Sequence, residues 1–224
     1  MPEIVLHQWE ISPFCGKVRR ILTHKGLGFQ TINYNGLRGR KAAGLSGPGT
    51  LPVIDYDGER VQDSTDIAAF LEAKHPEPPL FPTDPVARAK AHFWEDWADE
   101  SLYWFEVYLR FAYDDVRAKA IGLLSEGRPG FERALLGAAL KGRFKKKLAA
   151  QGLGKLPPAK VEEKFLAHVD ALEALLATQP WLVGSARTIA DIAVQSQLAE
   201  INRTSHLAPE LQKRAHVAKW LATA

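Results

Sequence analysis

The chain has 224 residues, of which 46% are hydrophobic, and its 29 basic and 26 acidic side chains leave a net charge of +3 at pH 7. This content supports one large buried core or two ordinary ones, and so small a net charge gives no reason to expect a nucleic-acid partner. A single cysteine, Cys15, excludes an intrachain disulfide framework and a multi-cysteine metal site, and we expect no bound metal. No apolar run approaches the ~18 residues of a membrane span, and the features of a signal peptide are missing, so we expect a soluble, cytoplasmic protein.

The first thirty-four residues predict a strand, a helix and a second strand. Residues 4–9 form a short apolar run with β-branched and aromatic side chains, which is typical of a buried strand, and Ser12 with the proline after it ends that run. From Cys15 onward apolar residues recur at helical spacing, and the basic residues that begin with Lys17 are expected on the opposite face. Residues 29–34 alternate at period two, which indicates the second strand.

The next segment predicts a loop, a hairpin and the start of a helix. Residues 35–49 contain five glycines, so they form a loop or at most a short helix. Pro52 lacks an N–H and suits the first position of a strand, and Asp57 with the glycine after it predicts a tight hairpin turn. Asp63 or Ser64 then caps a helix, whose unpaired N–H groups and positive dipole end would face a bound ligand.

A proline-rich linker separates this part from the rest of the chain. Residues 75–85 contain five prolines, which neither continue a helix nor pair in a central strand. Asp84 is the predicted N-cap of the next helix, with Pro85 at its first position. Beyond the linker we find no convincing strand, only amphipathic helices at about 86–113, 131–150, 159–177 and 209–221.

Aromatic residues gather on the helix predicted at 86–113. Five of them recur at three-, four- and seven-residue steps and therefore share a face: Phe93, Trp97, Trp104, Tyr108 and Phe111. Most of these side chains are expected in a packed helical core. Because Tyr and Trp carry polar tips, some of them are candidates for the wall of a ligand cleft instead.

Two further segments carry a recognisable pattern. Thr188 and Asp191 have the spacing of a capping box with an acidic third residue, which is a structural feature of a helix start. Residues 141–147 are locally basic, and a solvated helix face is the favoured interpretation, with an anionic partner as the alternative.

The order of these elements resembles that of the cytosolic glutathione transferases over the whole chain. The resemblance implies an α/β plus all-α fold, with a thioredoxin-like domain at residues 1–78 and a helical-bundle domain at residues 84–224. The residues that carry it are Ser12-Pro13-Phe14-Cys15 with Lys17-Val18-Arg19, Leu51-Pro52-Val53, Asp63-Ser64 with Ile67, and Gly184 followed by Thr188-Ile189-Ala190-Asp191. The resemblance is weakest over residues 120–160.

The same resemblance implies a binding site for glutathione as cosubstrate. Pro52 would follow a cis peptide bond, and the main chain of Val53 would bind the cysteinyl part of glutathione. Asp63 and Ser64 would take the γ-glutamyl end, and the cations of the glycine-rich loop would bind the glycine carboxylate. The residues implied to bind glutathione are Leu51, Pro52, Val53, Asp63, Ser64, Arg38 and Lys41.

Reactions of glutathione need a thiolate. One candidate residue would stabilise the thiolate of glutathione, and a second would supply a thiol of the protein itself. A free thiol with a pKa of about 8.5 is only a few per cent ionised at pH 7, and a hydroxyl at the start of a helix would stabilise the thiolate. Ser12 matches the catalytic hydroxyl of serine-type transferases such as the tau class. Cys15 matches the second cysteine of the glutaredoxin Cys-x-x-Cys pattern, where it is auxiliary or a small packed side chain.

The leading hypothesis is an enzyme that joins glutathione to a small hydrophobic electrophile, and the family implies a homodimer. The candidate substrate-contacting residues are Phe14, Trp97, Trp104 and Tyr108. A glutathione-dependent thiol reductase that uses Cys15 is the second hypothesis. A third is a binding or regulatory protein that keeps the fold without the reaction, because a fold alone does not determine function.

Overall fold

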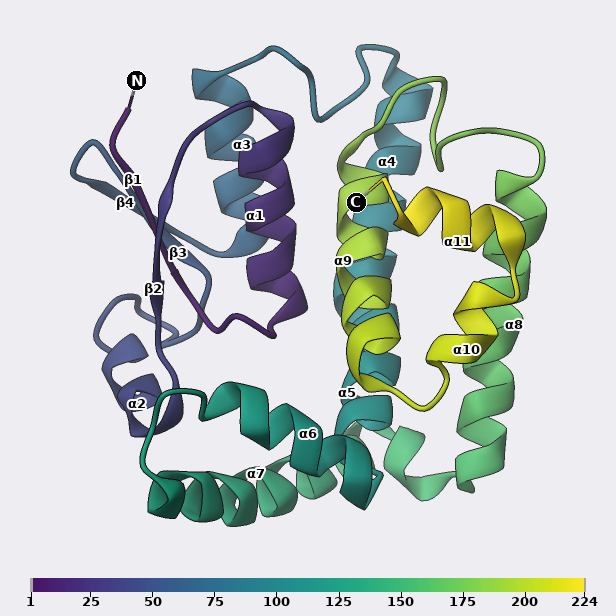
Figure 1. Ribbon diagram of the computed structural model, residues 1–224. Coiled ribbons are helices and arrows are strands. Elements are labelled where there is room, and N and C mark those ends of the chain that lie inside the picture. Colours follow the sequence, from purple (N-terminus) through teal and green to yellow (C-terminus); the bar gives the residue numbers. More distant parts are fainter. Residues whose placement is uncertain (1, 224) are drawn as a thin grey trace. The chain divides into compact units, whose positions relative to one another are not determined.

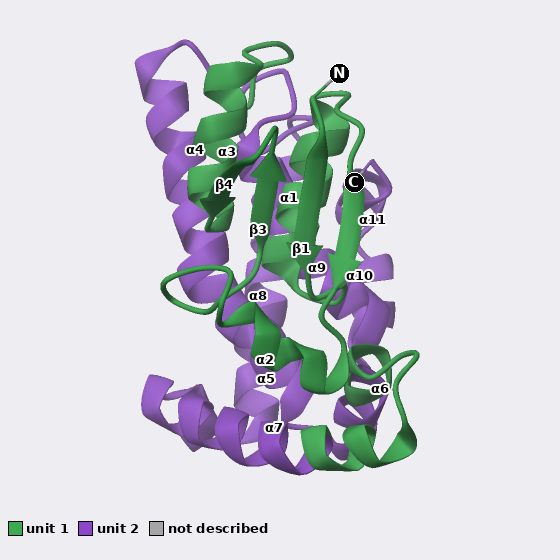
Figure 2. Ribbon diagram, turned by 90° about the vertical axis from the view of Figure 1, so that its left-hand side faces the viewer, with its two compact units in different colours: residues 1–80, 121–136 green, residues 81–120, 137–224 purple. Residues whose placement is uncertain are grey.

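The computed structural model describes residues 2–223, which form two compact units. The first unit consists of residues 1–80 and 121–136, and the second of residues 81–120 and 137–224 (Figure 2). The domain limits proposed from the sequence, 1–78 and 84–224, stay a prediction. In the described part of the chain, no helix is both long and apolar enough to cross a membrane.

A four-stranded sheet forms the centre of the first unit. Its strands are β1 (Ile4–Gln8), β2 (Gln30–Asn33), β3 (Val53–Tyr56) and β4 (Glu59–Gln62), in the spatial order β2-β1-β3-β4 (Figure 1). β1 pairs with β2 in parallel, which requires a crossover helix between them, and the two pairs that contain β3 are antiparallel. The predicted order of elements and the thioredoxin-like fold are confirmed.

Two helices, α1 (Pro13–His24) and α3 (Ser64–Lys74), lie side by side on one face of this sheet (Figures 1 and 2). Their apolar stripes are fully buried, as the sequence spacing predicts: Val18, Ile21, Leu22, Ile67 and Leu71. The glycine-rich segment after β2 forms only two short helical turns, η1 (Gly36–Arg38) and α2 (Gly39–Ala42).

The sequence pattern predicts Lys17 on an exposed basic face, but the structure places it elsewhere. Its side chain is only 1% exposed, and its Nζ donates to Thr65 Oγ1 at 3.1 Å, which connects α1 to the first turn of α3. The reason is helical geometry, since Lys17 is four residues before Ile21 and shares its buried stripe. A long aliphatic stem lets a lysine occupy such a position while its ammonium meets a polar partner.

The second unit is all-helical and is built around α9 (Ile189–Thr204), nearly all of whose residues are buried. The predicted aromatic helix is α4 (Pro85–Trp97), continued by a π-helical turn η2 (Ala98–Leu102) and by α5 (Tyr103–Phe111). Asp84 caps it by accepting the Ala87 N–H at 2.8 Å, as predicted. The remaining elements are α6 (Asp114–Leu124), α7 (Gly130–Gln151), η3 (Leu153–Lys155), α8 (Pro158–Leu176), α10 (Ala208–Gln212) and α11 (Ala215–Leu221). The end of α6 and the start of α7 belong to the first unit.

The single helix predicted at 209–221 is wrong, because the structure has two helices, α10 and α11, with a break at Arg214. The main chain of Arg214 is extended, and its guanidinium Nε donates to Asp170 Oδ1 of α8 at 2.8 Å. Glu173, also on α8, then accepts the Val217 N–H at 2.9 Å at the start of α11. Contacts with a distant helix therefore decide where the chain turns. The inward apolar positions, Leu211, Val217 and Trp220, are buried as predicted, whereas Leu221 is half-buried.

Candidate functional site

The first candidate group is the hydroxyl of Ser12, at the N-terminus of α1. Ser12 is the N-cap, with Pro13 at the first helical position, and its Oγ accepts the Cys15 N–H at 3.4 Å. The residue is half-buried. A hydroxyl that accepts one hydrogen bond still has its own proton to donate, and this hydroxyl lies at the positive end of the α1 dipole. The local structure thus offers a donor to an anionic sulfur.

Cys15 lies one helical turn further on, and its side chain is 0% exposed. It packs with Ala42, Leu51 and Val53 in a small apolar cluster. A buried thiol in apolar surroundings is a poor nucleophile, because burial disfavours the thiolate and blocks access. In this conformation Cys15 is a packed side chain.

The peptide bond between Leu51 and Pro52 is cis, as the family resemblance implies. Val53 follows within β3, in register with His7 of β1 and Gln62 of β4. Both main-chain groups of an antiparallel residue point toward the same neighbouring strand, so those of Val53 are directed into the sheet. Leu51 lies just before the strand, and within residues 2–223 no hydrogen bond engages its main chain. Leu51 therefore offers the unpaired main-chain groups here.

The N-terminus of α3 brings together the two residues predicted for the γ-glutamyl end. Asp63 is the N-cap, with a φ of 69°, and its Oδ1 accepts the Thr65 N–H at 2.8 Å. Ser64 is the first helical residue and is buried, whereas Asp63 is exposed. Lys17 reaches Thr65 from α1, a contact that the sequence analysis missed. An exposed carboxylate beside a helix N-terminus suits a zwitterionic ligand group.

The two predicted cations, Arg38 and Lys41, lie on η1 and α2 and are both exposed. The turn that contains Arg38 is held at its start, where the Leu37 N–H donates to the Glu132 carboxylate at 2.9 Å. No sequence motif marks Glu132 as part of this turn, since it is 95 positions further along the chain.

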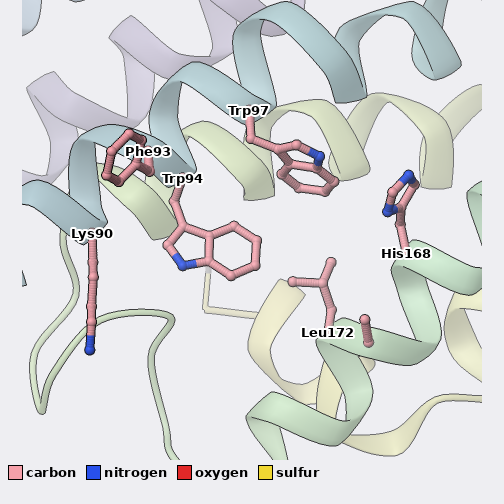
Figure 3. A pocket seen from close by; sticks show the side chains of 7 residues that line it. Lys90, Phe93, Trp94, Trp97, His168 and Leu172 are labelled. Carbon is pink, nitrogen blue, oxygen red and sulfur yellow. The ribbon is translucent and has the colours of Figure 1, made fainter.

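In the second unit an aromatic pocket of about 360 Å³ lies between α4 and α8 (Figure 3). Trp94 and Trp97 meet edge to face, with ring centroids 5.4 Å apart, and Trp97 makes a similar contact with His168. Phe93 also lines the pocket and is 75% exposed. Burial lowers the pKa of His168, which favours its neutral imidazole. The residues that line the pocket are Lys90, Phe93, Trp94, Trp97, His168, Ala171 and Leu172.

The predicted substrate-contacting aromatics do not share one environment. Trp97 lines the α4–α8 pocket, whereas Trp104 is half-buried against Tyr103. Tyr108 is only 5% exposed and packs edge-on against Tyr113, which is the arrangement of a core side chain. In the first unit Phe14 is half-buried in the opening turn of α1, two residues after the Ser12 hydroxyl.

Comparison with known families matches both parts of the chain. Residues 6–79 match the model described as "Glutathione S-transferase, N-terminal domain". Residues 146–223 match the model described as "Glutathione S-transferase, C-terminal domain". The two matched segments include Ser12, the cis-proline turn, the start of α3 and the capping box at Thr188.

Individual relatives are distant. The chain is 30% identical over 105 residues to glutathione S-transferase U22 of Arabidopsis thaliana, a match that covers 45% of this chain and 48% of that protein. The chain thus spans about half the length of this relative. It is 27% identical over 198 residues to an isoprene-epoxide–glutathione S-transferase of Rhodococcus sp., which covers 86% of this chain and 81% of that protein.

Among solved structures, the chain is similar to a glutathione S-transferase from Methylobacterium radiotolerans in complex with glutathione sulfonate. The TM-score is 0.63 and the sequence identity is 25%, over 99% of this chain and 89% of that one.

Proposed function

Since the chain belongs to the glutathione S-transferase family, we propose that it ionises the thiol of glutathione and directs the sulfur to a small hydrophobic electrophile. The observation that carries this proposal is the Ser12 hydroxyl, which caps α1 with its proton still available as a donor. Lowering a thiol pKa from about 8.5 by about two units requires roughly 2.7 kcal/mol of selective thiolate stabilisation. A charge-assisted hydrogen bond and a helix dipole together are of this order.

In the proposed reaction, the thiol loses its proton to solvent and the Ser12 O–H donates to the resulting thiolate. The sulfur lone pair then forms a bond to the electrophilic carbon, and the electron pair of the broken bond goes to the leaving atom, such as the oxygen of an opened epoxide ring. The relative named for isoprene epoxide supports an electrophile of this kind. The burial of Cys15 counts against a thiol reductase that forms a mixed disulfide at this residue.

The remainder of glutathione would extend over the surfaces described above. Its γ-glutamyl ammonium would meet the exposed Asp63 carboxylate, and its carboxylate the N-terminus of α3 at Ser64. For the cysteinyl main chain, the free groups of Leu51 suit the contact better than those of Val53, which point into the sheet. The glycine carboxylate would be bound by Arg38 and Lys41.

Glutathione itself gives the first test. Ligand at a hundredfold excess over its Kd stabilises a protein by about 2.7 kcal/mol, so we expect millimolar glutathione to raise the melting temperature by roughly 5 °C or more. Differential scanning fluorimetry would measure the shift, with an equimolar mixture of glutamate, cysteine and glycine as control. A melting temperature that is the same with glutathione as with the control mixture would contradict the proposal.

We also propose that the protein is a homodimer and that the aromatic pocket between α4 and α8 lies in its interface. Phe93 and Val86 are large apolar side chains exposed on the same helix, and clustered exposed apolar surface is typical of protein–protein contacts. The substitution Phe93→Glu would place a charge in that interface at a cost of several kcal/mol. We therefore expect Phe93→Glu to sediment as a monomer.

The matched control for the dimer is Phe131→Glu, because Phe131 is another exposed phenylalanine, on α7. This variant is expected to remain dimeric in sedimentation velocity. A wild-type monomer, or a Phe93→Glu variant that stays dimeric, would show that the pocket does not mediate self-association.

A further inference from the structure

The glycine-rich turn after β2 is held by a segment that is distant in sequence but belongs to the same compact unit. Glu132 Oε2, in the first turn of α7, accepts the Leu37 N–H at 2.9 Å. Beside it, Asn35 Nδ2 donates to the carbonyl of Glu126 at 3.1 Å. Figure 2 shows residues 121–136, which contain the end of α6 and the start of α7, in the green of the first unit. The turn that carries the predicted cations is therefore fixed at its beginning by residues 126–132.

The Glu132 carboxylate is itself firmly held. It is 3% exposed, and Arg128 donates to both of its oxygens, from Nε to Oε2 at 3.1 Å and from Nη2 to Oε1 at 2.6 Å. The Arg128 hydrogen bonds, followed by that from the Leu37 N–H, lower the pKa of Glu132, so the group is ionised at neutral pH. A bidentate pair fixes the orientation of the carboxylate as well as its charge.

Gly36 shows how closely the two segments approach. Its φ is +60°, a conformation that side chains disfavour, and a Cβ atom there would lie 2.2 Å from Glu132 Oε2. The same Cβ would lie 3.0 Å from Arg128 Cγ. A residue with a side chain at position 36 would therefore clash with the Glu132 carboxylate, so this contact requires glycine there.

The charges of this contact are compatible with an anionic ligand nearby. Glu132 alone would repel a carboxylate, but its ion pair with Arg128 compensates the negative charge locally. Arg38 and Lys41 follow Leu37 within four residues, and both are exposed. The buried carboxylate thus orders the main chain in front of the cations without cancelling them.

We propose that Glu132 is a positioning residue of the glutathione site: by holding Leu37, it preorganises Arg38 and Lys41 for the glycine carboxylate of glutathione. This inference rests on the proposed function. A turn that is already ordered loses less conformational entropy when the ligand binds, so the contact raises affinity without touching the ligand. Its effect is confined to the glycine end, since Ser12 and α3 hold the other parts of the ligand.

The test compares two ligands, glutathione and γ-glutamylcysteine, which lacks the glycine carboxylate. Calorimetry with the wild type is expected to show tighter binding of glutathione. In Glu132→Ala the affinity for glutathione is expected to fall about tenfold, or about 1.4 kcal/mol, while that for γ-glutamylcysteine changes less than about twofold. In steady-state kinetics the KM for glutathione rises while kcat at saturation stays within about twofold of the wild type.

Glu126→Ala is the matched control, because the Glu126 side chain is exposed and only its main-chain carbonyl accepts from Asn35. Both affinities should stay as in the wild type. If Glu132→Ala does not fold, Glu132→Gln keeps an acceptor for Leu37 but loses the ion pair with Arg128, and a loss of about threefold, again for glutathione alone, is expected. An equal loss for both ligands, or no loss, would overturn the positioning role. A wild type that binds neither ligand would overturn the proposed function instead.

Discussion

Ser12→Ala is expected to lower kcat/KM for glutathione conjugation about a hundredfold at pH 6.5, the magnitude that follows the loss of one preorganised donor to a developing or resident anion. The loss has a specific cause, because the variant leaves α1 and the ligand surfaces in place and removes only the hydroxyl at the helix start. The apparent pKa of the bound thiol should return toward about 8.5, so activity should recover as the pH rises. Stopped-flow absorbance of the thiolate at different pH values measures this directly.

Two variants separate the hydroxyl from other effects at this helix start. Ser12→Thr keeps a hydroxyl and a capping oxygen, so it is expected to retain most of the activity. Ser12→Ala also loses the helix cap, which is expected to lower the stability of the protein by about 1 kcal/mol. Cys15→Ala, at a fully buried position, is expected to change kcat/KM less than about threefold. If Ser12→Ala kept full activity and Cys15→Ala lost it, the two roles would be reversed.

Asp191→Ala is expected to have the largest effect on stability, a loss of about 4 kcal/mol, because it leaves several buried donors without an acceptor. Asp191 Oδ1 accepts from the Leu182 N–H at 2.9 Å and from Trp220 Nε1 at 3.0 Å. Its Oδ2 accepts from the N–H of Thr188 at 2.9 Å and from the hydroxyl of Thr188 at 3.2 Å. Burial raises the pKa of this carboxyl, and these four hydrogen bonds oppose that shift. One side chain thus joins a loop, the start of α9 and α11.

Thermal unfolding followed by circular dichroism would measure the effect, which should lower the melting temperature by roughly 10 °C. Glu163→Ala is the control, since Glu163 is an exposed acid on α8 whose ion pair with Lys160 contributes about 0–1 kcal/mol. A melting temperature for Asp191→Ala that equals that of the control would show that the four hydrogen bonds do not hold the second unit together.

Local patterns were sufficient for much of the fold. The strands, α1, α3 and the cap at Asp84 depend on residues a few positions apart, and the structure confirms them. The capping box is confirmed for the same reason, since Thr188 and Asp191 are three residues apart. What spacing did not reveal about Asp191 is its two further partners, Leu182 and Trp220, which only the tertiary fold brings to it.

Three features that the sequence did not predict depend on contacts between distant residues. The break between α10 and α11 is fixed by the contact of Arg214 with α8, and no local helix signal in residues 209–221 marks it. The charge of Lys17 favours a solvated face, although its spacing from Ile21 places it on the buried stripe. Glu132 carried no recognisable motif, and its importance appears only when the turn at Leu37 is placed against it.

The contact between Glu132 and Leu37 also makes the first compact unit discontinuous in sequence, with about forty residues of the second unit between its two segments. During synthesis the sheet with α1 and α3 emerges before residue 132, so the turn at Gly36 has no anchor until the start of α7 has also left the ribosome. The entropy cost of closing the loop between Leu37 and Glu132 grows only slowly with loop length. A contact between residues so far apart in sequence nevertheless forms later in folding than a local contact does. Formation of the anchored turn at Gly36 is therefore coupled to the synthesis of the chain as far as α7, and a separately expressed fragment that ends near residue 80 would lack the Glu132 contact.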